Sequence, residues 1–239
     1  MEPMATGRHA SFPVVDVHPN DHHQGHTDRD LAVLESWLRE TVGEPSPDIG
    51  RSGAVCPFTN PALKAGAMDL TLRYDVDGDP EHIRAIMVDT LHRFTSRGRG
   101  VDHPSRATRL ECEIVAFPAL AAEHWSLIDK VHPELKDLSV DLGLMLGQFH
   151  PRCDEGAVRN PLFPVARSPF PLFAVRFMAP HDILFLNKRR QWFERYRKRF
   201  PAEASGAFRD GLVRELAERA RDRFGVPDPS VRGTEGERP

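Results

Sequence analysis

The sequence predicts an α+β (or α/β) fold in a single domain, with a mixed or largely antiparallel sheet covered by helices. Segments in which apolar residues alternate, as in half-buried strands, interleave with segments in which apolar residues recur at helical spacing. The last two predicted strands have no helix between them, which favours a sheet that is not purely parallel. With 239 residues, of which 40% are hydrophobic and 28% charged, the chain can bury one sizeable core.

The apolar pattern also places the elements along the chain. We expect, in order, a helix over 28–42, a strand over 68–76, a helix over 83–94, a strand over 109–117, a helix through 125–128, strands over 142–150 and 172–179, and helices over 183–200 and 204–223. A proline-rich loop separates the last two strands. Residues 1–28 and 225–239 show no periodicity, so we expect a disordered arm and a disordered tail around a catalytic domain at 29–224.

Composition excludes several classes of function. The net charge of −3 does not indicate a nucleic-acid or membrane partner, and no apolar run reaches the roughly 20 residues that span a bilayer. The first residues lack the basic and apolar regions of a signal peptide. Three cysteines at irregular spacing form no disulfide framework. We therefore expect a cytoplasmic protein that acts on a small molecule, without nucleic acid or membrane.

No standard motif reveals the chemistry, because the sequence lacks a GxGxxG, a Walker loop, an HExxH, a GxSxG and a CxxC pair. Single residues must carry the hypotheses. Cys56 precedes Pro57 and a short helix that Thr59 or Asn60 can cap, so the helix dipole favours its thiolate. It is a candidate catalytic nucleophile or a sulfur ligand of heme iron. The structural alternative is a small buried side chain before a turn.

His150 ends a predicted strand in the segment FHPRC, because Pro151 stops the strand there. The imidazole then lies at a sheet end, where pockets of sheet-based folds often occur. It is a candidate catalytic residue, and the base for Cys56 in a cysteine-dependent enzyme. His150 and Cys153 are also spaced for a metal, although a structural zinc site would need Cys56 and a distant histidine to converge. The alternative is a histidine bonded to loop carbonyls.

His181 lies between Pro180 and Asp182, where a strand ends and a helix starts. The fixed backbone suits an iron ligand whose second ring nitrogen donates to Asp182 or to a carbonyl. The alternative is a polar helix start. A basic, aromatic-rich helix follows, with Arg189 and Arg190 at its start. Its charge suits binding of heme propionates, of an anionic substrate or of nucleic acid. The structural alternative is a helix face exposed to solvent. Net negative charge makes nucleic acid the weakest of these.

Three short motifs resemble those of a bacterial family of unknown function. They are CPF at 56–58, FHP at 149–151 and RSPFP at 167–171, and the resemblance extends over 51–190. The segment PLFAVRFMAPHDILFLNKRR, residues 171–190, is more distantly similar to heme-dependent arginine N-hydroxylases. That similarity implies a heme-dependent oxygenase that hydroxylates a guanidine or amine of an amino-acid-derived substrate in natural-product biosynthesis.

The resemblance further implies heme b with His181 as the axial metal ligand and His150 on the distal side. Cys56 would shape the pocket or ligate the iron through its thiolate. The cofactor-binding residues expected with His181 are Arg167, Arg176, Arg189 and Arg190. An external electron donor is compatible with this chemistry, and so is a homodimer. Two other hypotheses stay open: a non-catalytic heme or small-molecule binding protein, and a cysteine-dependent enzyme that uses Cys56.

Overall fold

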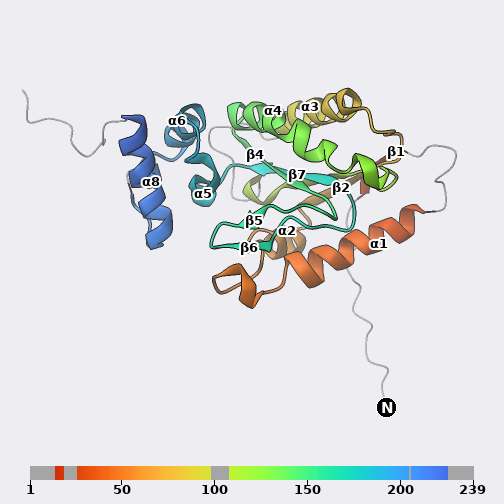
Figure 1. Ribbon diagram of the computed structural model, residues 1–239, viewed down its shortest axis with the longest axis horizontal. Coiled ribbons are helices and arrows are strands. Elements are labelled where there is room, and N and C mark those ends of the chain that lie inside the picture. The colour runs from red at the N-terminus through yellow and green to blue at the C-terminus, as the bar shows by residue number, and fades with distance from the viewer. Residues whose placement is uncertain (1–13, 19–25, 98–107, 205, 226–239) are drawn as a thin grey trace, which may run out of the picture.

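A computed structural model of the chain describes residues 14–18 (backbone only), 26–97, 108–204 and 206–225 (Figure 1). The strands are β1 Val14–His18, β2 Met68–Arg73, β3 Cys112–Ala116, β4 Leu144–Phe149, β5 Gly156–Ala157, β6 Asn160–Pro164 and β7 Leu172–Phe177. The α-helices are α1 Thr27–Trp37, α2 Thr59–Ala65, α3 Pro80–Arg97, α4 Leu127–Asp141, α5 Ile183–Leu186, α6 Arg190–Arg199, α7 Pro201–Ala204 and α8 Gly211–Phe224.

The main sheet has the strand order β1-β2-β3-β7-β4. β1, β2 and β3 are parallel, whereas β7 runs antiparallel to both of its neighbours, β3 and β4. The prediction of an α+β fold in a single domain with a mixed sheet is thereby confirmed. A second, two-stranded sheet of β5 and β6 lies in the segment between β4 and β7, where only a proline-rich loop was expected.

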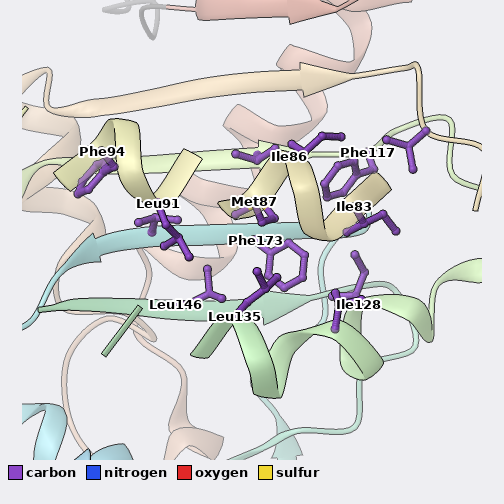
Figure 2. Packing of buried hydrophobic residues seen from close by; sticks show 14 of the residues in the cluster. Ile83, Ile86, Met87, Leu91, Phe94, Phe117, Ile128, Leu135, Leu146 and Phe173 are labelled. Atoms are coloured by element: carbon purple, nitrogen blue, oxygen red, sulfur yellow. The ribbon is translucent and has the colours of Figure 1, made fainter. Parts of the chain in front are cut away.

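Helices cover both faces of the sheet: α3 and α4 lie over one face and α1 and α2 over the other (Figure 1). Figure 2 shows the first of these interfaces, where α3 points Ile83, Met87 and Leu91 at the sheet and α4 adds Ile128 and Leu135. These side chains are four residues apart in α3 and seven apart in α4, that is, one or two helical turns, so each helix presents one apolar face to the strands. Burying each of them contributes about 1.5–3 kcal/mol.

The alternation of side chains along the strands determines which residues form the core on the opposite face of the sheet. Leu70 and Leu72 of β2 and Ile114 of β3 pack with Leu34 of α1 and Ala62 of α2. The intervening residue of β3, Val115, belongs to the core under α3 and α4. A strand buried on both faces reads as a continuous apolar run, and β3 has that pattern from Ile114 to Ala116. Glu113, the residue before this run, is also buried, and its carboxylate pairs with Arg93 and Arg97 of α3.

A third core joins the C-terminal helices to the sheet. Phe193 and Tyr196 of α6 and Val213 of α8 pack with Val140 near the end of α4 and with Met145 of β4. Figure 1 shows α5, α6 and α8 together beside the sheet, at the β4 side. The last helices thus extend the domain beyond β4. None of the helices in the described ranges is both long and apolar enough to cross a membrane.

The expected helix over 183–200 is wrong as one element, because the structure breaks it into α5 and α6. The side-chain amide of Asn187 donates to the carbonyls of Ile183 and Leu184 at 2.6 and 3.1 Å. These bonds satisfy the last carbonyls of α5 and end it. The helix expected over 204–223 is likewise replaced by α7 and α8, with Asp210 as the N-cap of α8.

Two smaller expectations also need correction. Residues 14–18 were expected in a disordered arm, but they form the parallel edge strand β1. The remainder of that arm up to residue 25, and the tail from 226, lie outside the described residues. Neither Thr59 nor Asn60 caps α2: the helix has Phe58 at its N-cap position without a side-chain bond. Asn60 instead donates to the carbonyl of Gly43 at 2.7 Å.

Two basic side chains of α4 are fixed against one strand carbonyl. Lys136 donates to the carbonyl of Leu146 in β4 at 3.1 Å, and the Nε2 of His132 lies 3.3 Å from the same oxygen. Burial, followed by the charge of Lys136, lowers the pKa of His132 to about 4. Burial also lowers the pKa of Lys136 to about 8. At neutral pH, His132 is therefore uncharged and donates its proton to β4.

We predict that His132 makes the fold sensitive to acid. The unfolded chain binds a proton at the ordinary histidine pKa near 6.5, whereas the folded chain binds it only near 4, so stability falls as the pH drops through this window. The loss amounts to ~2 kcal/mol. Urea unfolding at pH 7 and pH 4.5 measures it. His132→Gln keeps a donor for Leu146 and should flatten this part of the profile; an unchanged profile would contradict the assignment.

Candidate functional site

The pairing of β4 with β7 brings two of the sequence motifs together. Phe149, the last residue of β4, lies opposite Leu172, the first residue of β7. The chain between them therefore leaves and returns at the same end of the sheet. At the start of this excursion, the N–H of His150 donates to the carbonyl of Ala166 at 3.3 Å. The FHP and RSPFP motifs, distant in sequence, thus meet at one sheet end.

A tight turn then folds Cys153 back beside His150. The N–H of Cys153 donates to the carbonyl of His150 at 3.0 Å, which closes the turn. Pro151 has its φ angle fixed by its ring at the first turn position, where proline is favoured. The three-residue spacing noted in the sequence is therefore a real juxtaposition. Both side chains are nearly inaccessible, with 4% of His150 and 2% of Cys153 exposed.

Asp129 of α4 completes the cluster from the other side. Its Oδ2 lies 2.8 Å from the Nε2 of His150, and its Oδ1 accepts a bond of 3.0 Å from the amide of Gln148. The N–H of Arg152 points at the other ring nitrogen of His150, Nδ1, over 3.3 Å. Because Nδ1 accepts, the ring proton is on Nε2 and is donated to Asp129.

Asp129, His150 and Cys153 form a compact cluster. One potential ligand atom from each residue lies within 4.8 Å of the other two. Burial raises the pKa of the Cys153 thiol, and the charges of Asp129, Glu155 and Asp154 raise it further. The thiol is therefore protonated at neutral pH. Electrostatically, the cluster opposes a free thiolate and favours a positive charge.

A cleft of about 580 Å³ opens beside the cluster. Its lining comes from five parts of the chain: Asp129 of α4, Gln148 of β4, the stretch 153–158 with Pro161, Leu184 and Phe185 of α5 with Asn187 and Lys188 after it, and Leu216 of α8. Three carboxylates, those of Asp129, Asp154 and Glu155, face one ammonium, that of Lys188. The lining residues within α5 and α8 are apolar: Leu184, Phe185 and Leu216.

A proline in the middle of α4 marks the helix at this site. Pro133 has no N–H to donate to the carbonyl four residues earlier, which is that of Asp129. One hydrogen bond of the helix is thus missing at the residue that faces the cleft. Nothing in the sequence identified Asp129, because its partners come from a strand and a turn that follow it. The Asp-x-x-x-Pro spacing is the one local signal near it.

Arg167, expected to bind a cofactor, instead holds the cysteine turn. Its Nε donates to the carbonyl of Cys153 at 3.3 Å, and its Nη2 pairs with Asp154 at 3.0 Å. The indole of Trp37 donates to the carbonyl of Arg167 at 3.2 Å. Through these bonds, the RSPFP motif and α1 fix the position of Cys153. Arg167 thus positions the cluster and does not line the cleft.

Arg176, a second expected cofactor ligand, forms a buried ion pair. Its two terminal nitrogens lie 2.8 and 2.5 Å from the carboxylate oxygens of Asp182, which is 1% exposed. Its guanidinium also stacks on Phe58 of the CPF motif, 4.1 Å from the ring centre. Asp182 was expected to orient His181; it accepts instead from Arg176 and from the N–H of Ala179 at 2.6 Å.

Cys56 lies near Cys112 and Arg176, and not beside His150. Cys112 faces Arg176 across β3 and β7. Burial raises the pKa of the Cys112 thiol to about 12, with the nearby Cys56 as the second cause. Cys56 and His150 therefore belong to different parts of the structure, and the expected nucleophile–base pair does not form. The cysteine that His150 meets is Cys153.

The remaining expected heme residues lie on the surface. His181 is exposed and packs against Phe208, with ring centres 5.6 Å apart. Arg189 pairs with Asp137 at 3.0 Å and stacks on Trp192. The structure does not bring these residues into the cleft. Heme ligation by His181 stays a prediction to which this arrangement adds no support.

Arg190, expected beside a propionate, is also exposed. It lies 3.8 Å from Glu194, one turn along α6, and 5.8 Å from the ring centre of Phe224. Within the described ranges, the group of metal-ligating side chains is Asp129, His150 and Cys153. The sequence identified two of its three members.

Comparison with known proteins gives a family but no activity. Residues 31–210 match the family described as "Domain of unknown function (DUF6875)". No curated protein matches the chain. No solved structure matches it either. The expected membership of a family of unknown function is confirmed, whereas the similarity to heme-dependent arginine N-hydroxylases has no support here.

We predict that Arg176→Met destabilises the fold by about 3 kcal/mol, because it leaves the buried carboxylate of Asp182 without its counter-charge. Urea unfolding measures the loss. Arg189→Met is the matched control: its partner Asp137 is only partly buried and keeps contact with water, so the expected cost is below ~1 kcal/mol. Equal effects of the two substitutions would contradict the structural role assigned to Arg176.

Proposed function

The chain belongs to the DUF6875 family, whose description names no activity, so we propose a function from the geometry of the cleft. The protein is an enzyme whose substrate is a small, positively charged nitrogen compound, an amine or a guanidine, bound beside Asp129, His150 and Cys153. The observation that carries the proposal is the coincidence of an acidic cleft with this cluster.

The charge of the cleft supports the substrate class. Asp154 and Glu155 lie at the cleft with Asp129, and Lys188 is the single basic residue among its lining side chains. Arg167 pairs with Asp154 at the outer side, so Glu155 is the carboxylate most available to a ligand. A guanidinium or ammonium group is the natural partner of such a surface, because it can donate to carboxylate oxygens with charge assistance.

The apolar wall supports a substrate that also has a carbon chain. Leu184 and Phe185 of α5 and Leu216 of α8 line the side of the cleft formed by the C-terminal helices. Ligand sites combine such walls with a few polar groups that fix orientation. An amino-acid-derived amine or guanidine has both parts. The volume of about 580 Å³ suits a molecule of that size.

The cluster supplies groups able to move protons. His150 is neutral in the hydrogen-bonding pattern described, with its Nε2 proton donated to Asp129. A carboxylate held against an imidazole fixes the orientation of the ring, as in general acid–base pairs. Cys153 contributes a protonated thiol beside this pair. The Asp129–His150 pair is therefore the acid–base component of the proposed site, and Cys153 does not act as a free thiolate.

We predict that the protein binds arginine more tightly than citrulline, its neutral isostere, because only arginine carries the charge that the cleft favours. Glu155→Gln should weaken arginine binding about twofold to fivefold, and Lys188→Gln should strengthen it by a similar factor, as expected for exposed charges. Citrulline binding should change little in both variants. Isothermal titration calorimetry at low ionic strength measures all six affinities, those of the two ligands for the unmodified protein and for each variant.

The paired variants make this test specific. Each of the two substitutions removes one charge from the same cleft, so a general loss of structure would shift both affinities in the same direction. Opposite shifts for arginine and none for citrulline support the proposal. Equal binding of arginine and citrulline by the unmodified protein, or tighter binding of an anion such as succinate, would refute the substrate class.

A further inference from the structure

We propose that Asp129, His150 and Cys153 bind one Zn²⁺ ion at the floor of the cleft, with a fourth coordination position open to the cleft. The site joins α4 to the end of β4 and to the turn that follows it. This inference deepens the proposed function at the same site, and it rests on that function only for the role of the open position. With zinc bound, Asp129 and His150 are ligands, and the acid–base role proposed for the metal-free pair passes to a water in the open position.

The three side chains offer the ligand types that zinc uses in proteins. A cysteine sulfur, a histidine nitrogen and a carboxylate oxygen each ligate Zn²⁺ at about 2.0–2.3 Å. Calcium and magnesium prefer oxygen ligands alone, so a site with one sulfur and one nitrogen disfavours both ions. The chemistry of the donor set therefore selects a borderline-soft divalent metal.

The spacing is close to that of a tetrahedral site. Two ligand atoms on one tetrahedral zinc lie about 3.4–3.6 Å apart, given bond lengths of about 2.0–2.3 Å. The Nε2 of His150 and the Oδ2 of Asp129 are 2.8 Å apart, and the three ligand atoms lie within 4.8 Å of one another. Side-chain shifts of ~1 Å therefore convert the cluster into a zinc site.

The proton on the imidazole must move when the metal binds. In the metal-free cluster it lies on Nε2 and is donated to Asp129. Zinc at Nε2 takes the place of this proton, and the neutral ring then carries its proton on Nδ1. The contact that gives way is the 3.3 Å bond from the N–H of Arg152, the longer of the two at this ring.

The surroundings hold the ligands in place. Gln148 donates to the second oxygen of Asp129 at 3.0 Å, and Arg167 holds the carbonyl of Cys153 at 3.3 Å. Partners of this kind orient ligating side chains in metal sites and raise metal affinity. His150 and Cys153 are buried, so they are shielded from competition by water.

The charges at the cluster favour a cation there. Asp154 and Glu155 follow Cys153 in the chain and line the cleft with Asp129, so carboxylates lie beside the proposed metal position. The thiolate and the carboxylate of Asp129 then offset the two charges of the ion. Of the two other carboxylates at the cleft, Asp154 is paired with Arg167, so Glu155 is the one that a cationic substrate would meet.

The position of the cluster indicates an open site. Asp129 and Cys153 both line the cleft, so an ion between them is accessible from it. Three protein ligands with one free position are the arrangement of catalytic zinc, whereas structural zinc has four protein ligands. A water or a substrate atom would occupy the free position. Zinc would act there as a Lewis acid or lower the pKa of the bound water.

The test begins with metal binding by the untagged, full-length protein. After chelation and dialysis, titration with ZnCl₂ alone should give one site per chain and release about one proton per ion, from the thiol of Cys153. Co²⁺ should give a thiolate-to-cobalt charge-transfer band. Cys153→Ser should abolish the band, and His150→Gln and Asp129→Asn should each weaken Zn²⁺ binding by at least about 10-fold.

Matched variants separate this site from others. Cys56→Ser and His181→Ala should bind zinc as the unmodified protein does. A full-length variant with His22, His23 and His26 replaced by alanine excludes binding by the N-terminal histidines. The proposal is overturned if the unmodified protein binds no Zn²⁺ at micromolar concentration, if cobalt gives no charge-transfer band, or if the band persists in Cys153→Ser.

The metal and substrate proposals can fail separately. Binding of Zn²⁺ is measured without any organic ligand, whereas discrimination between arginine and citrulline depends on Glu155 and Lys188, which are not ligands of the proposed metal. If the protein binds zinc but shows no preference for arginine, the proposed metal site stands and the proposed substrate class is refuted. If the protein prefers arginine but binds no zinc, the substrate class stands and the metal site is refuted.

Discussion

The site depends on the antiparallel pairing of β4 with β7. Because Phe149 lies opposite Leu172, residues 150–171 must leave the sheet and return at the same end. The turn that carries His150 and Cys153 is thereby held near the segment that carries Arg167. If β7 were parallel to β4, the connection would cross the sheet and the two motifs would lie at opposite ends. One choice of strand direction therefore assembles the cluster.

Helix α4 supplies the second constraint, because one element serves the core, the sheet and the site. Its apolar face packs on the sheet beside α3, while Lys136 and His132 are fixed to a carbonyl of β4. One turn before His132, Asp129 reaches the end of the same strand. Any shift of α4 along β4 would break all of these bonds together. The carboxylate is thus positioned by the packing of the whole helix.

The sequence was sufficient for the parts of the fold that rest on local pattern. Alternation identified β2, β3, β4 and β7, and the absence of a helix between the last two predicted a mixed sheet. The helix breaks were missed, because Asn187 ends α5 through side-chain bonds that compete with a continuing apolar pattern. His150 and Cys153 were found by spacing, but Asp129 was not, since only tertiary packing brings it to them.

The arginines show why the charge of a segment was a poor guide to the site. Arg176, Arg189 and Arg167 each meet a carboxylate, those of Asp182, Asp137 and Asp154. In the basic segment after β7, Arg189 and Arg195 pair with Asp137 and Asp141 of α4, so these charges contact the neighbouring helix and not the cleft. At the cleft the balance is reversed, because several carboxylates face one lysine. A chain with a net charge of only −3 can therefore contain a locally acidic cleft. Function follows the local field at a cavity, and folding redistributes that field in ways that no run of residues in the sequence displays.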